Sequence, residues 1–96
     1  MAGIASTMID QIPVPSPDVE VEVVDGEVLL YHPRQTRAVY LNPSAAVIWS
    51  LCDGRRTVAE IIRLIGENYP DAKENLSEEV FDTLHELINS GVLVAK

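Results

Sequence analysis

Apolar positions near the start of the chain alternate with polar ones, and this spacing predicts β-strands. Val19, Val21 and Val23 alternate with acidic residues, and period two with β-branched side chains is typical of a half-buried strand. Asp25-Gly26 follows and predicts a two-residue hairpin turn, because glycine tolerates the positive φ of such turns. A three-stranded antiparallel meander is therefore expected. The first strand is predicted to begin at residue 19, the second to span 28–31 and the third to span 37–41. A turn over 33–36 is expected to connect the second and third strands.

Helical spacing replaces this alternation after residue 41, in three segments that each begin with a capping signal. Asn42-Pro43 places a capping side chain before a proline suited to the first helical position. Thr57 and Glu60 form a capping box, and Ser77 is expected to cap the third helix. The helices are expected to end at Gly54, Pro70 and Gly91. Residues 92–94 are expected to form a short closing strand. The predicted fold class is α+β: a winged-helix-like domain with a three-stranded antiparallel sheet followed by three helices.

The domain organisation follows from the length and from the N-terminal prolines. A chain of 96 residues fits one domain. Pro13, Pro15 and Pro17 fix their own backbones and bias their predecessors, which favours an extended arm. Residues 1–18 are therefore predicted to be a flexible, proline-containing N-terminal arm, and residues 19–96 the folded domain.

Charge and cysteine content narrow the classes of partner and compartment. The formal net charge is -8, from 15 acidic and 7 basic residues, which disfavours nucleic acid as a partner. One cysteine allows no internal disulfide, and a reducing cytoplasm is the expected location. The first residues have no signal-peptide pattern, and no apolar stretch approaches the length of a membrane helix. No membrane association is expected.

The chain contains no group of residues at the spacing expected of a catalytic site. His32 and His85 have no companions at ligand spacing, so no metal site is predicted. Cys52 lies on an apolar helical stripe and is expected to be a small core residue. Arg55 and Arg56 near a helix start are expected to belong to an exposed turn, with anion binding as the alternative. The chain is predicted not to be an enzyme, with no catalytic residues and no cofactor.

The third predicted strand is the feature that favours a binding function. A meander has an open edge, and Arg37–Leu41 contains only one charge and no proline to block pairing with another chain. An extended peptide is therefore predicted to add to this edge. Leu84 and Leu87 of the third helix are expected to wall the site, although they and Leu41 also fit an ordinary core.

Taken together, three stretches of the chain resemble the PqqD family. They are Leu30-Tyr31-His32-Pro33, then Leu41-Asn42-Pro43-Ser44-Ala45-Ala46-Val47-Ile48-Trp49, then Leu51-Cys52-Asp53-Gly54-Arg55-Arg56-Thr57-Val58-Ala59-Glu60-Ile61. The last helix follows at a matching distance, so that the resemblance covers about 19–94. The segment before the first strand matches nothing in the family.

The resemblance implies a peptide chaperone that binds the leader region of a ribosomally made precursor peptide. It also implies delivery of that peptide to a tailoring enzyme, of the radical S-adenosylmethionine type in pyrroloquinoline quinone biosynthesis or of another type in related pathways. In similar domains the leader adds as a strand beside the third strand, in a groove shared with the third helix. On this chain the implied site comprises Arg37, Ala38, Val39, Tyr40, Leu41, Val80, Thr83, Leu84 and Leu87.

Two further expectations concern the charges and the backbone of this site. Arg34 and Arg37 are expected to attract acidic leader residues. Val39→Pro is expected to abolish binding, provided that the N–H of Val39 points away from the sheet. The alternative functions are a winged-helix DNA-binding domain, a module for another protein partner, and a small enzyme or quinone-binding subunit.

Overall fold

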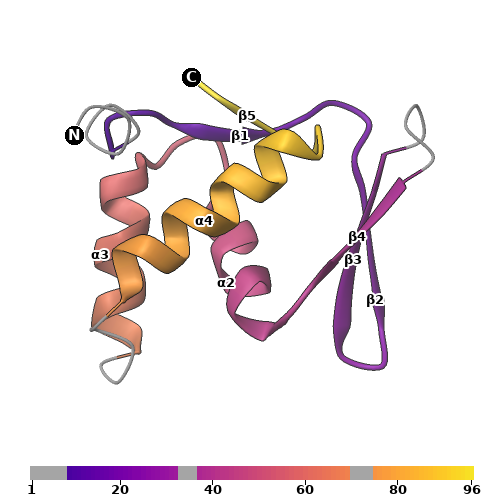
Figure 1. The fold of residues 1–96 in the computed structure, drawn as a ribbon, viewed down its shortest axis with the longest axis horizontal. Helices are drawn as coiled ribbons and strands as arrows, with labels where there is room; N and C mark the ends of the chain where they lie inside the picture. Colours follow the sequence, from indigo (N-terminus) through magenta and orange to yellow (C-terminus); the bar gives the residue numbers. More distant parts are fainter. Residues whose placement is uncertain (1–8, 33–36, 70–74) are drawn as a thin grey trace.

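The computed structural model describes residues 9–32, 37–69 and 75–96 and confirms the α+β class (Figure 1). A three-stranded sheet stands at one end of the molecule, and three helices lie to one side of it. The strands are β1 (Pro13–Pro15), β2 (Glu20–Val24), β3 (Glu27–His32), β4 (Arg37–Leu41) and β5 (Leu93–Ala95). The helices are α2 (Pro43–Leu51), α3 (Val58–Asn68) and α4 (Leu76–Asn89). The predicted turn at 33–36 and the predicted stop at Pro70 lie outside the described residues.

The main sheet has the predicted meander, with strand order β2-β3-β4 and antiparallel pairing throughout. Asp25 and Gly26 connect β2 to β3 with φ values of 52° and 80°. Two successive residues with positive φ are the signature of a type I′ hairpin turn. Because the turn has two residues, it fixes Val24 opposite Glu27 and thereby the register of the hairpin. The predicted hairpin is confirmed.

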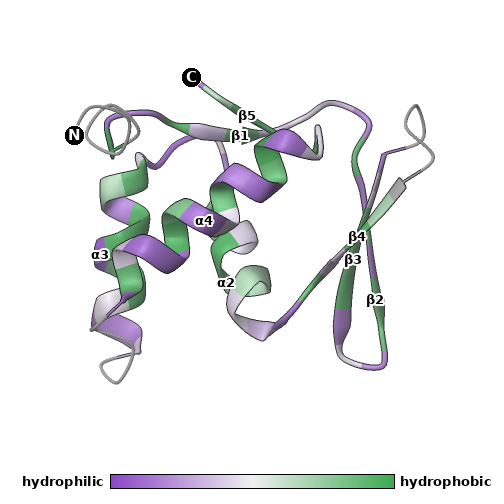
Figure 2. Cartoon of the chain, viewed as in Figure 1, coloured by the Kyte–Doolittle hydropathy of each residue, from purple (hydrophilic) through white to green (hydrophobic). Residues whose placement is uncertain are grey.

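Strand β2 is present, but the prediction that it is half-buried is wrong. All five of its residues are exposed, including Val21 and Val23 with exposed fractions of 51% and 68%. Figure 2 shows hydrophobic colour on this strand, yet the helices stand on the far side of β3 and β4 from it. Period two distinguishes the two faces of a strand, and it does not reveal whether another element covers either face.

The capping signals explain where two of the three helices begin. Asn42 accepts a hydrogen bond from the backbone N–H of Ala45 at 2.8 Å, and Pro43 occupies the first turn of α2. At α3, Thr57 and Glu60 form both bonds of a capping box. The predicted cap at Ser77 is wrong, because α4 begins at Leu76 and Ser77 already lies within its first turn. Asn75 precedes this helix without a side-chain capping bond. The acidic first turn compensates in part, since the N-terminal dipole favours anions.

The hydrophobic core lies between the helices and the inner face of the sheet. It draws side chains from β3, β4, all three helices and the chain end. Among the described residues, no buried polar or charged side chain interrupts it. Its members are Leu30, Leu41, Ile48, Cys52, Val58, Ile61, Ile65, Val80, Leu84, Leu87, Val92 and Leu93, and Pro13 of β1 is buried as well.

The N-terminal segment departs from the predicted flexible arm, because residues 13–15 form strand β1. This strand pairs antiparallel with β5, with Pro13 opposite Ala95. The prolines are tolerated because each strand of a two-stranded ribbon has an open edge, where a missing N–H costs nothing. The carbonyl of Pro13 also accepts from Gly54 and that of Gln11 accepts from Val58. The N-terminal segment therefore ties the α2–α3 connection to the end of the chain.

Candidate functional site

The open edge of β4 is defined by which of its backbone groups point away from the sheet. In a two-residue hairpin the flanking pair, Val24 and Glu27, is hydrogen-bonded, and bonded pairs then recur at every second residue. On β3, residues 27, 29 and 31 therefore bond to β2, and 28, 30 and 32 bond to β4. Their β4 partners are Arg37, Val39 and Leu41. The N–H and C=O groups of Ala38 and Tyr40 consequently point to the open edge.

This alternation of backbone directions corrects the expectation for Val39. Its N–H points toward β3, so a proline at this position would remove a hydrogen bond within the sheet and leave the outward-pointing groups of β4 in place. The next edge position, Asn42, is already engaged. Its carbonyl accepts from Ala46, and its side chain caps α2. Four backbone groups, on Ala38 and Tyr40, are thus available for an added strand.

Side chains of β4 alternate between two environments. Leu41 faces inward and is buried, and Val39 is half-buried against the core. Ala38 and Tyr40 lie on the outer face, and Tyr40 has an exposed fraction of 72%. A strand added at this edge would therefore have its side chains alternately beside Val39 and beside Tyr40.

Three of the four predicted wall residues of α4 are buried, which agrees with the ordinary-core alternative that the sequence left open. Val80, Leu84 and Leu87 have exposed fractions of 0%, 0% and 1%. They belong to the hydrophobic core and leave almost no surface accessible to a ligand, and Leu41, with an exposed fraction of 6%, is similar. Thr83 is half-buried at the margin of the helix. Of the four predicted α4 residues, Thr83 is the one that presents surface to a ligand.

An apolar hollow of about 280 Å³ lies where the starts of α2 and α4 meet the end of α3. Its walls are Pro43, Ser44, Val47, Ile48, Ile65, Tyr69, Leu76 and Glu79. Leu76, Glu79 and Thr83 follow one another at i, i+3 and i+7, so they share one flank of α4. The hollow therefore lies on the same side of α4 as Thr83. Its wall includes Pro43, which follows the end of β4 by two residues. Sequence periodicity gave no signal for it, because its lining comes from three helices.

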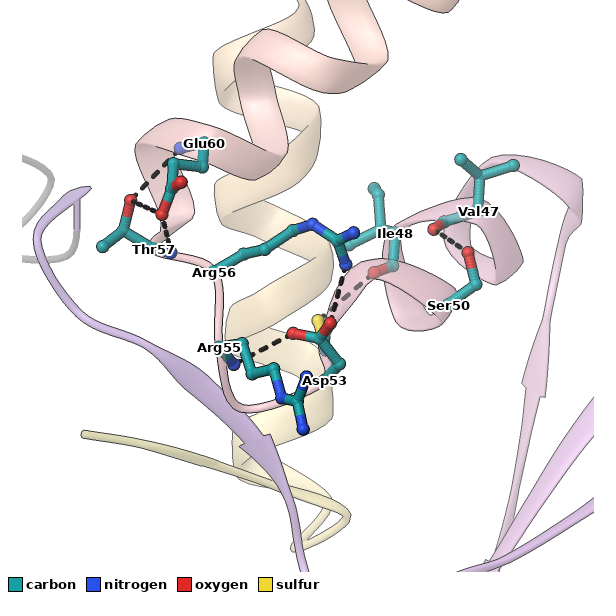
Figure 3. Close-up of polar contacts among 9 residues, drawn as sticks. Val47, Ile48, Ser50, Asp53, Arg55, Arg56, Thr57 and Glu60 are labelled. Atoms are coloured by element: carbon teal, nitrogen blue, oxygen red, sulfur yellow. Dashed lines mark hydrogen bonds and ion pairs between the residues drawn. The ribbon is translucent and has the colours of Figure 1, made fainter.

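Of the four arginines considered as charged contacts, two lie in a closed turn and two have side chains outside the described structure. Arg34 and the side chain of Arg37 belong to the latter group, so their electrostatic role stays a prediction. Figure 3 shows Arg56 reaching back to Asp53, with Nη1 and Oδ2 2.8 Å apart. Asp53 also accepts from the backbone N–H of Arg55 at 2.9 Å, and this bond is the main reason that its pKa is lowered. The turn is internally satisfied and exposed, as expected.

Cys52 occupies the core, as predicted, with an exposed fraction of 3%. Its Sγ lies 3.2 Å from the carbonyl oxygen of Ile48. Burial, with a smaller contribution from Asp53, raises the pKa of the thiol to about 12. A thiol with this pKa is a poor nucleophile at neutral pH.

Within residues 9–32, 37–69 and 75–96, no group of three or more His, Cys, Asp or Glu side chains is placed to hold a metal ion. None of the helices in these ranges has the length and apolar character needed to cross a membrane.

Comparison with known proteins identifies relatives of this arrangement. Residues 27–93 match the sequence profile of the family described as coenzyme PQQ synthesis protein D (PqqD). No curated protein sequence is significantly similar to the chain. One similar solved structure is TbiB1 in complex with the TbiA(beta) leader peptide, with 26% identity and a TM-score of 0.71 over 82% of this chain and 92% of that one.

A second similar structure is a lasso peptide synthetase B1 complexed with the leader peptide. It has a TM-score of 0.74 over 86% of this chain and 98% of that one. With 17% identity, this match shows a likeness of fold alone.

Proposed function

The chain belongs to the PqqD family, and on that premise we propose that it binds the leader region of a ribosomally made precursor peptide and presents it to a tailoring enzyme. The observation that carries this proposal is the open edge of β4, where Ala38 and Tyr40 direct four unpaired backbone groups outward. Both structural relatives described above were solved with leader peptides bound. Addition of a strand to a sheet edge is a common way for a domain to bind an extended peptide.

An antiparallel leader strand makes two hydrogen-bonded pairs on this edge, one with Ala38 and one with Tyr40. Net stabilisation is about 1 kcal/mol per bond, so four bonds give affinity without selecting a sequence. Selection comes from side chains, with Val39 and Thr83 on the inner side. Core residues Val80, Leu84 and Leu87 support this surface from beneath.

The proposed role in catalysis is positioning, carried out by a chain that is itself non-catalytic. A leader held by this domain, with the domain docked on a radical S-adenosylmethionine or other peptide-modifying enzyme, raises the effective concentration of the core peptide. Tethering of this kind increases apparent affinity by about 10²- to 10⁴-fold when the geometry allows both contacts. The reaction is expected in the cytoplasm, where precursor peptides are made.

The test is calorimetric titration of the protein with the leader peptide encoded beside its gene. Saturable one-to-one binding that is lost when the peptide sequence is scrambled supports the proposal. Absence of binding, with the neighbouring enzyme also present, would refute it. Retention on heparin at moderate salt would instead favour the DNA-binding alternative, which the net charge of -8 disfavours.

A further inference from the structure

The outer face of the sheet carries an exposed aromatic side chain beside the open edge. Tyr40 has an exposed fraction of 72%, the largest among the exposed apolar and aromatic side chains of the described residues. The opposite residue on β3 is Leu29, which is half-buried. Leu29 and Tyr40 form a non-hydrogen-bonded pair, the closer of the two kinds, so their side chains lie against each other.

The same alternation that exposes the backbone of Tyr40 also fixes the neighbour of its ring. Because its N–H and C=O both point outward, an antiparallel strand places one residue directly opposite Tyr40. The side chain of that residue lies on the outer face, with Cβ atoms about 5 Å apart. Its two neighbours along the peptide point inward, toward Val39 and the α4 side.

We propose that Tyr40 determines part of the peptide specificity by packing against an aromatic, β-branched or long aliphatic side chain on the outer face of the bound leader strand. This inference rests on the proposed function and adds to it a contact outside the groove. The bound peptide is thereby read on both of its faces. Apolar cross-strand pairs of this kind stabilise pairing beyond the backbone bonds.

The charge distribution on the outer face favours an apolar partner over a basic one. Glu22 lies in the same cross-strand row as Leu29 and Tyr40, and Glu20 lies in the next row with Tyr31 and Ala38. Both acids are on β2, three strand spacings or about 14 Å from an added strand, and a third acid of this face, Glu27 on β3, is two spacings or about 9.5 Å away. Both distances exceed the screening length of about 8 Å at physiological salt. The acids are therefore too distant to hold a cation opposite Tyr40.

The test is a double-mutant cycle by calorimetric titration, pairing Tyr40→Thr with an alanine scan of the leader. Threonine keeps a high β propensity, so the edge strand is expected to persist, and urea unfolding checks this. Binding should weaken about 3- to 5-fold, the equivalent of a cross-strand pair. One leader position should lose affinity on alanine substitution in the wild-type protein and show no further loss with Tyr40→Thr. Tyr40→Phe should bind like the wild type, because the ring makes the contact.

The matched control is Val24→Thr, an exposed apolar residue on the same outer face at the far strand. It should leave affinity unchanged. Wild-type affinity in Tyr40→Thr with an unaltered alanine profile would overturn the inference while leaving the proposed function in place. A loss in Tyr40→Phe equal to that in Tyr40→Thr would overturn the apolar contact in favour of the hydroxyl. Failure of the wild-type protein to bind any leader would overturn both proposals.

Discussion

Proline substitutions at two adjacent residues of β4 separate edge binding from sheet stability. Ala38→Pro removes an N–H that points to the open edge, at an exposed residue where no bond within the sheet is lost. One lost ladder bond weakens leader binding by about 1 kcal/mol, and the proline ring obstructs the neighbouring bond by a similar amount. The expected result is a 10- to 30-fold rise in Kd, at about 1.4 kcal/mol per tenfold change. Unfolding in urea should change little.

Val39→Pro should have the opposite pattern, with its main effect on stability rather than on the edge groups that bind the leader. Its N–H belongs to the pair with Leu30, whose side chain is completely buried, so the substitution leaves an acceptor unsatisfied inside the sheet. The free energy of unfolding should fall by about 1–3 kcal/mol, out of about 5–14 kcal/mol for a domain of this size. Titration and urea unfolding are measured on both variants, with Ala38→Val as the control that keeps the N–H. Wild-type affinity in Ala38→Pro, together with a folded Val39→Pro that does not bind, would refute the assignment of the edge groups.

Three further predictions concern the framework of the domain. Thr57→Ala removes the capping hydroxyl that Glu60 N–H donates to and should lower the free energy of unfolding by about 1 kcal/mol; no change in the urea midpoint would contradict it. The raised pKa of Cys52, from 9.0 to about 12, means that the unfolded thiol ionises first as pH rises above 9. Stability is therefore complete well below pH 9 and falls by about 1.4 kcal/mol by pH 10, a loss that Cys52→Ala should lack in parallel urea titrations. Leu84→Ala should cost about 2–5 kcal/mol and reduce leader binding only as the folded fraction falls; a selective loss of affinity at full stability would instead show that Leu84 reaches the peptide.

Local signals in the sequence predicted the elements well where each one depends on a few adjacent residues. The hairpin followed from Asp25-Gly26, and the start of α3 followed from Thr57 and Glu60. Features that depend on distant pairing could not be found in this way. Strand β1 exists because Pro13 lies opposite Ala95, and no pattern within a short window reports such a partner.

The candidate site shows the same division. Periodicity placed Val80, Leu84 and Leu87 on one face of α4, and it could not distinguish a buried face from one that lines a groove. The hollow beside Leu76 and Tyr69 was also missed, since three helices must be assembled before it exists. The direction of the Val39 N–H was predictable only in part. The two-residue turn fixes which residues of β3 bond to β4, but their partners depend on the β3–β4 register, which comes from the folded structure.

The pairing of β1 with β5 brings the two ends of the folded domain together, so that the domain is suited to insertion or fusion. Because Pro13 and Ala95 are neighbours across a two-stranded ribbon, the chain enters and leaves the folded unit at the same place. A unit with adjacent ends can be inserted into a loop of a larger protein, or joined to either terminus, without stretching the host. The open edge of β4 lies on a different sheet from that ribbon. Fusion to a modifying enzyme through these ends would therefore leave the proposed peptide-binding edge unobstructed.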